Sequence, residues 1–153
     1  TDESGIRELV QKSDTLLKDT DLMKEKAIMT RFFAELGKNG LAAYGENEVM
    51  KALELGQVEK VLVSEQIEWY VYHVKKNNGE DRYIIDKDQS FNENSLKGEE
   101  QIEIVEEFEF IDYMMEKAAS TSAGIEIVSV ETPEGEQFYK GFGGIGAMLR
   151  YKI

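Results

Sequence analysis

Apolar residues in the first third of the chain recur with the spacing of helices. Between residues 5 and 18 they tend to one side of a helix. Asp19–Asp21 then offers cap residues for a second helix that runs to about Gly37. A third helix is predicted over Glu46–Leu55, because Gly56 stands where a helix C-cap is expected. The pattern therefore predicts three helices in this part of the chain.

Short apolar runs later in the chain have the character of strands. Val58–Val63 ends in three unbroken apolar residues, which is typical of a strand buried on both faces. A helix is predicted over Phe108–Ala119 and a strand over Ile125–Val130. Thr132 then caps a helix with a proline at its first position, and Ala147–Lys152 forms a final strand. Helices that alternate with buried strands predict an α/β fold, a three-layer α/β/α sandwich.

The pattern changes between residues 65 and 107. A β-rich run leads to the turn signal Asn77–Gly79, and Arg82–Ile85 follows as a return strand. This stretch holds 12 acidic residues against 5 basic ones, and little that could form a core. We therefore expect a small, mostly β inserted subdomain at 65–107, within a sandwich made of residues 1–64 and 108–153.

The overall composition narrows the class of protein. An apolar fraction of 41% with a single proline is typical of a folded domain, and no run approaches the roughly 18 to 20 apolar residues of a membrane span. Without cysteine there can be no disulfide and no thiolate metal site. The polar start at Thr1–Gly5 is unlike a signal peptide and lacks an initiator methionine. These features predict a cytoplasmic chain excised from a longer one.

The charge is strongly acidic, with 31 acidic residues against 18 basic ones and a formal net charge of −13. Such a surface repels phosphate backbones, because nucleic-acid binding depends on lysine and arginine. It would instead steer the domain toward a partner with a basic face. Taken alone, composition favours the simpler interpretation that the charge only keeps the protein soluble.

Residues for enzyme chemistry are scarce, so we predict no catalytic residue, cofactor or metal. His73 is the single histidine, and no nucleophile–base–orienter set is visible. The acidic run Glu99–Asp112 is expected to be a solvated edge. Gly141, Gly143 and Gly146 match the spacing of a dinucleotide fingerprint, but the order here is helix then strand. That motif needs a strand before it and a helix after it, so the match is rejected.

The end of the chain holds the most specific pattern. Four glycines fall within the six positions of Gly141–Gly146, and Leu149–Tyr151 reads leucine, arginine, tyrosine. The string resembles the signature G-F-G-G-I-G-x-x-L-R-Y, which closes the class I peptide chain release factors of archaea and eukaryotes. Ala147 and Met148 replace a small residue and an isoleucine there, and both changes preserve size and apolarity.

A second string, Tyr44–Gly56 with its continuation to Ser64, supports this resemblance and raises two alternatives. It is similar to Y-G-x-x-x-V-x-x-A-L-x-x-G in release factors and in the ribosome-rescue factor Pelota. It also resembles G-x-N-E-x-x-K of kink-turn RNA-binding ribosomal proteins, which implies a related fold. Four glutamates against two lysines in residues 41–64 disfavour RNA binding. Pelota-like chains lack the segment F-x-K-G-F-G-G-I-G before their last strand, which Phe138–Gly146 matches here.

The resemblance implies the third, C-terminal domain of a release factor. The G-G-Q and N-I-K-S motifs of that family are absent, so peptidyl-tRNA hydrolysis and stop-codon reading are expected in upstream domains. For this domain the resemblance implies docking of a translational GTPase and of the ABC-type ribosome recycling ATPase, on the ribosome in the full-length protein, with no direct nucleic-acid or membrane binding. Many archaeal relatives hold the inserted subdomain with zinc and two cysteine pairs, whereas this cysteine-free chain is expected to be metal-free there.

The tail is predicted to form part of the partner-binding surface. Phe138 and Phe142 are four residues apart on a short helix, so they share a side. In the final strand Leu149 and Arg150 point in opposite directions. An arginine beside an aromatic residue has the composition of an interface hot spot. The candidate partner-binding residues are Phe138, Phe142, Gly143, Gly144, Ile145, Arg150 and Tyr151.

Overall fold

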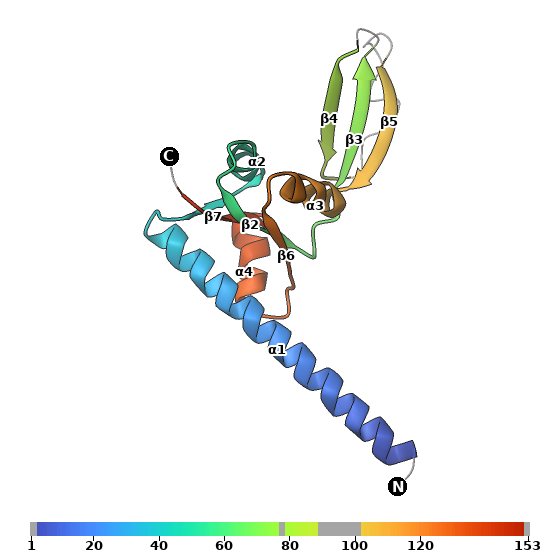
Figure 1. Ribbon diagram of the computed structural model, residues 1–153, viewed down its shortest axis with the longest axis vertical. Coiled ribbons are helices and arrows are strands. Elements are labelled where there is room, and N and C mark those ends of the chain that lie inside the picture. Colours follow the sequence, from blue (N-terminus) through green and yellow to red (C-terminus); the bar gives the residue numbers. More distant parts are fainter. Residues whose placement is uncertain (1–2, 77–78, 89–101, 152–153) are drawn as a thin grey trace.

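The computed structural model describes residues 3–76, 79–88 and 102–151, which form four helices and two sheets (Figure 1). The helices are α1 (Glu3–Gly37), α2 (Glu46–Glu54), α3 (Phe110–Ser120) and α4 (Pro133–Phe142). The strands of the first sheet are β1 (Ala42–Tyr44), β2 (Val58–Ser64), β6 (Gly124–Val128) and β7 (Ile145–Leu149). Those of the second are β3 (Tyr70–Lys76), β4 (Asp81–Asp86) and β5 (Ile102–Glu109).

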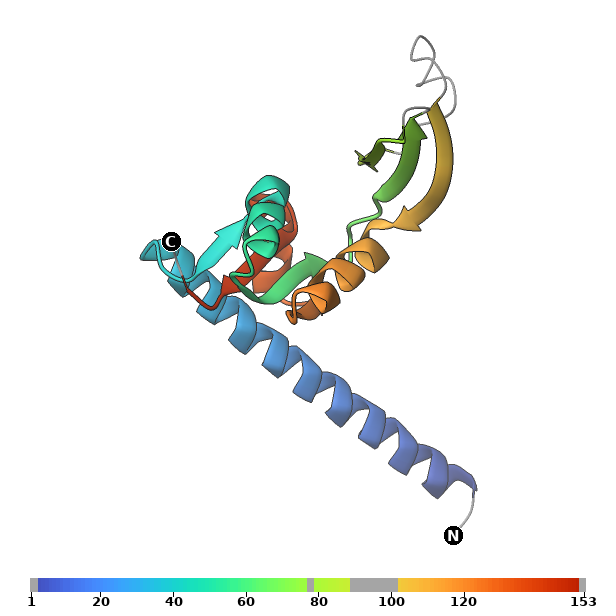
Figure 2. The ribbon, with the colours of Figure 1, turned by 45° about the horizontal axis from the view of Figure 1, so that its top comes forward.

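The first sheet is the middle of three layers. Its strand order is β1-β7-β2-β6, with β7 antiparallel to both neighbours and β2 parallel to β6. Helices α1 and α4 cover one face, while α2 and α3 cover the other (Figures 1 and 2). The predicted three-layer α/β sandwich is confirmed.

A single helix replaces the two expected at the start of the chain. α1 continues through Asp19–Asp21, which we predicted to cap a second helix. That prediction was wrong because aspartate and threonine favour caps but cost only tenths of a kcal/mol inside a helix. No glycine or proline lies between Ile6 and Leu36 to force an end. In both ribbon views the first half of α1 projects beyond the sandwich.

Each face of the sheet buries its own apolar core. On the α1–α4 side, the ring of Phe32 meets that of Phe138 edge-on at 5.4 Å, and Leu62 and Met148 reach them from the sheet. On the other side the core is larger and joins α2, α3 and the strands. Its fully buried members with the largest side chains include Leu53, Val61, Phe110, Met114 and Ile145.

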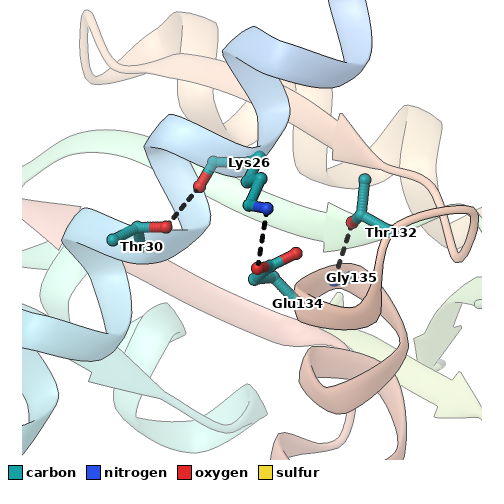
Figure 3. A network of polar contacts seen from close by, with 5 residues as sticks. All are labelled: Lys26, Thr30, Thr132, Glu134 and Gly135. Atoms are coloured by element: carbon teal, nitrogen blue, oxygen red, sulfur yellow. Dashed lines mark hydrogen bonds and ion pairs between the residues drawn. The ribbon is translucent and has the colours of Figure 1, made fainter.

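Helix α4 is fixed at both ends by the residues that predicted it. The Thr132 hydroxyl accepts a hydrogen bond from the Gly135 amide at 3.0 Å, and Gly143 ends the helix with φ 78°. Figure 3 shows this cap beside the Lys26–Glu134 ion pair (3.8 Å), which links α1 to α4. The last strand begins at Ile145, two residues earlier than predicted.

The second sheet is antiparallel, with the order β4-β3-β5. It contacts the sandwich through aromatic rings. The ring centroids of Trp69 and Phe110 lie 5.0 Å apart, and those of Tyr83 and Tyr113 lie 5.6 Å apart. β5 passes directly into α3, so that helix starts at Phe110 rather than at Phe108. The turn predicted at Asn77–Gly79 lies mostly outside the described residues. The division into a sandwich and an inserted subdomain at 65–107 stays a prediction.

Candidate partner-docking surface

The seven candidate residues of the tail divide into a buried set and an exposed set. Phe138 is 0% exposed and Ile145 1%, and Gly144 is also buried. These three cannot contact a partner across the surface, so their assignment to it is corrected. Gly143, Arg150 and Tyr151 are exposed, and Phe142 is partly exposed. Only these four remain candidates for direct partner contact.

Two of the glycines in the motif are required by close packing. A Cβ on Gly146 would lie 2.7 Å from the ring of Phe32 and 3.1 Å from that of Phe138. Gly144 has φ 78°, and a Cβ there would meet Ser64 at 3.0 Å. Glycine at position 146 therefore lets β7 pass under α1 and α4, and glycine at position 144 lets the chain approach Ser64 and Ile67.

Phe142 leads from the core to the surface. Its ring packs against Phe33 at 5.3 Å and against Tyr44 at 5.2 Å in an edge-on arrangement. Tyr44 belongs to β1 and is 51% exposed. Tyr44 is not among the predicted site residues, although it begins the second family-like string, Tyr44–Gly56.

Arg150 and Tyr151 are held at the opposite end of β7 by backbone carbonyls. The Arg150 amide donates to the Gln57 carbonyl (2.7 Å), and its Nη2 donates to the Ser122 carbonyl (2.5 Å). The Tyr151 hydroxyl donates to the Leu55 carbonyl (3.1 Å). Tyr151 remains 47% exposed and Leu55 49%. These bonds keep two large apolar side chains next to each other at the surface.

A hollow of about 720 Å³, which we call the edge groove, lies along β1 between these two ends. Tyr44 lines it and contacts Phe142, and Leu55 lines it and bonds to Tyr151. The groove was not predicted, because it depends on β1 being the terminal strand of the sheet. Its lining residues are Leu36, Asn39, Ala42, Ala43, Tyr44, Glu48, Lys51, Ala52, Leu55, Gln57 and Leu149.

Charged groups frame the groove without filling it. Glu48 and Lys51 line its α2 wall, and both side chains are exposed. Below the α1 wall, Glu35 accepts the Leu41 amide at 2.8 Å and pairs with Lys38 at 3.2 Å. The Leu41 hydrogen bond, followed by the one to Lys38, lowers the pKa of the Glu35 carboxyl below its usual value. This carboxylate therefore stabilises the turn that leads into β1.

The residues that matched the kink-turn pattern lie on the first turns of α2. Asn47, Glu48 and Lys51 are exposed there, and Gly45 precedes the helix with φ 92°. Glu46 in the same turn pairs with Lys87 at 2.8 Å. Since Glu46 and Glu48 both lie in the first turn, the exposed Lys51 stands beside two acidic residues, which disfavours phosphate there.

His73 packs and hydrogen-bonds within the second sheet. Its ring stacks on Tyr83 at 4.7 Å, and Nε2 lies 3.0 Å from Asp81 Oδ1. Within residues 3–76, 79–88 and 102–151, no group of three histidine, cysteine or acidic side chains is arranged to hold a metal ion. In the same ranges no helix is both long and apolar enough to cross a membrane.

Comparison with known proteins identifies the family. The family model described as eRF1 domain 3 matches residues 22–153. The peptide chain release factor subunit 1 of Archaeoglobus fulgidus is 41% identical over 99% of this chain, which spans 38% of that relative's length. The solved C-terminal domain of the Methanosarcina mazei release factor matches with a TM-score of 0.85 and 33% identity, covering 99% of this chain and 96% of that one.

A more distant structure shares the fold alone. Archaeal Pelota, in a model of ribosome-bound Pelota and ABCE1, matches with a TM-score of 0.60 at 23% identity, covering 100% of this chain and 34% of that one. The family match and the archaeal relatives confirm the resemblance found in the tail and in residues 44–64. The chain therefore belongs to the eRF1 domain 3 family, as the C-terminal domain of an archaeal-type translation termination factor.

Proposed function

We propose that this domain docks partner proteins for a peptide chain release factor. The partners are a translational GTPase and the ABC-type ATPase that recycles ribosomes. Its relatives are release factor subunits of which this chain spans about 38%, so reading of stop codons and hydrolysis of peptidyl-tRNA are assigned to the rest of the factor. The domain itself is not an enzyme, and it works in the cytoplasm, where ribosomes are.

Archaeal Pelota supports the choice of partner class. It has the same fold, and the matching structure is a model of ribosome-bound archaeal Pelota and ABCE1. A domain with this fold is therefore compatible with a ribosomal setting that includes that protein.

The observation that carries the proposal is the group of apolar side chains around the edge groove. Tyr44, Leu55 and Tyr151 are 51%, 49% and 47% exposed, and all three lie on or beside this one hollow. Large apolar side chains gathered around a concave surface are typical of protein-binding sites. Tyrosine is also enriched among interface hot spots.

Electrostatics favours a protein partner over a nucleic acid. The net charge of −13 attracts a basic protein face and raises the rate of association with it. The same charge opposes phosphate, since RNA binding requires cations that displace counterions. The kink-turn alternative therefore has less support than docking, although the two proposals share the exposed turn at Asn47–Lys51.

Isothermal titration calorimetry of this chain with the translational GTPase of the same organism tests the proposal. Binding is expected, and Tyr151→Ala should lower the affinity at least about fivefold, close to the 1 kcal/mol of a hot-spot contact. Tyr139→Ala is the matched control, because Tyr139 is a 36% exposed tyrosine on α4 that lines a separate hollow with Gln66 and Lys140. The Tyr139→Ala variant should bind the GTPase with the same affinity as the parent.

Two results would contradict the proposal. One is the absence of binding to both the GTPase and the ATPase. The other is a submicromolar affinity for a kink-turn RNA in a mobility-shift assay at physiological salt, which would favour the RNA-binding alternative. An equal loss in the two tyrosine variants would leave docking intact but move it away from the edge groove.

A further inference from the structure

The backbone of β1 has an open edge toward the groove. β1 is the terminal strand of its sheet. Two hydrogen bonds to β7 flank it: the Leu149 amide donates to the Leu41 carbonyl (3.0 Å), and the Gly45 amide donates to the Ile145 carbonyl (2.9 Å). In an antiparallel pair successive peptide groups alternate in direction. Leu41, Ala43 and Gly45 therefore face β7. Ala42 and Tyr44 direct their peptide groups away from it.

Space for another chain lies along that edge. The edge groove runs beside Ala42, Ala43 and Tyr44, with Leu36 of α1 on one side and Leu55 beyond α2 on the other. The two alanines leave room where larger side chains would close the hollow. A strand added in plane would lie about 4.8 Å from β1, within hydrogen-bonding distance of the outward peptide groups.

We infer that the edge groove accepts an extended segment of the docked partner as a fifth strand beside β1. This rests on the proposed docking function and specifies how the contact is made. The Ala42 amide already donates to the Gly40 carbonyl (3.0 Å), so the Ala42 carbonyl and the Tyr44 amide and carbonyl are the groups that would bond to the segment. These main-chain hydrogen bonds would supply affinity, and the apolar walls would select alternate apolar side chains of the segment. Glu48 and Lys51 both line the α2 wall, so the segment would place a lysine or arginine opposite Glu48 and away from Lys51.

A second copy of this chain is a less suitable occupant. Edge strands can pair with copies of themselves, but two chains of net charge −13 repel each other. A basic partner segment gains from the same charge. β6, the other terminal strand of the sheet, does not line the groove, and Glu126 in it pairs across the strands with Lys60 at 3.9 Å. β1 is therefore the favoured edge for strand addition.

Amide hydrogen exchange by NMR tests the inference directly. In the free chain the Tyr44 amide should exchange quickly, and the Ala43 amide slowly because it faces β7. Saturating GTPase should slow the Tyr44 amide at least about tenfold, as a new backbone hydrogen bond would. The amides of β6 serve as the control and should not change.

A charge-reversal pair gives an independent measurement. Glu48→Lys should lower the GTPase affinity at least about fivefold, whereas Glu54→Lys on the same helix should change it less than twofold. Both variants alter the net charge equally, so long-range steering cancels between them. Glu54 is exposed and does not line the groove.

The outcomes separate the mode of binding from binding itself. Protection of Tyr44 together with the Glu48 effect supports strand addition. GTPase binding without protection of Tyr44 overturns strand addition and leaves the docking function standing. Absence of binding overturns both. Protection of Tyr44 that rises with the concentration of the chain alone, with a dimer in sedimentation, overturns the choice of a partner segment in favour of a second copy.

Discussion

The adjacent strands β7 and β1 pair with each other but lie in different surroundings. All five residues of β7 are buried, between β1 and β2 and between two helical layers. β1 has three residues, none fully buried, and its outer edge faces the groove. The family string that runs through β7 is therefore mainly a packing motif. The proposed function lies at the exposed end of that string, at Arg150 and Tyr151, and on the neighbouring strand β1.

This difference explains why the residues that identify the family and the residues proposed to bind a partner are largely separate in the tail. The glycines and Phe138 satisfy close contacts under α1, which only small or well-fitted residues can do. Such positions tolerate few changes and so give a specific string. The exposed residues Arg150 and Tyr151 lie at the end of the same string, where packing is weaker and a partner can reach them. The predictions below test this division.

The largest effect is expected from Leu149→Ala in the buried strand. Leu149 is 5% exposed and belongs to the core under α2 and α3. Its truncation should lower the free energy of unfolding by roughly 2 to 5 kcal/mol, measured by urea denaturation. Leu55→Ala is the control from the groove, 49% exposed, and should change stability by about 0.5 kcal/mol or less. Equal losses would refute the division between core and surface.

Gly146→Ala should have the next largest effect. The added Cβ would lie 2.7 Å from Phe32, so the buried rings must move, at a cost of about 1 to 3 kcal/mol in the free energy of unfolding. Gly141→Ala is the matched control in the same motif, because the nearest atom would be Gln137 Cγ at 3.8 Å. It should stabilise α4 by up to about 1 kcal/mol. A harmless Gly146→Ala would show that the motif is not set by packing.

Much of the fold could be predicted because the apolar spacing of helices differs clearly from that of strands. The unbroken run in Val58–Val63 and the cap at Thr132 determine their elements locally, and both are confirmed. The continuity of α1 through Asp19–Asp21 was missed, since the same residues occur in caps and inside long helices. The sequence did contain a signal for one continuous helix, because no glycine or proline lies between Ile6 and Leu36.

The candidate site was predicted less well. Apolar residues of a motif look alike in sequence whether they pack inside or face a partner, so Phe138 and Ile145 were assigned to the surface although they are buried. The edge groove required knowledge that β1 is terminal and pairs only with β7 inside its sheet. That is a long-range property of strand order. Sequence spacing near Tyr44 does not contain it.

Arg150→Ala examines the boundary between the two regions. The side chain is exposed but donates to the Ser122 carbonyl, so its loss should lower the free energy of unfolding by no more than about 1 kcal/mol. We expect it to weaken binding of the translational GTPase by at least about 1 kcal/mol. Circular dichroism and calorimetry measure the two quantities. Binding as tight as that of the parent, with the fold unchanged, would remove Arg150 from the docking surface.

The smallest effect should come from Glu35, which braces the entrance to the edge strand. The hydrogen bond from Leu41 lowers the pKa of this carboxyl below 4.5, so the charged form stabilises the folded state. This contribution is present above the unfolded pKa and is lost as the pH falls through the lower folded value. Glu35→Gln keeps an acceptor for Leu41 but loses the charge.

The parent should therefore be more stable than Glu35→Gln at neutral pH, and the difference should shrink as the pH is lowered below 4.5. Urea denaturation of both proteins across this range measures it. Because Leu41 leads directly into β1, the protection factor of the Ala43 amide, corrected for the intrinsic exchange rate at each pH, should also fall at low pH, while those of the β7 amides stay high. A stability difference that is constant with pH would mean that the Glu35 charge does not stabilise the turn into the edge strand.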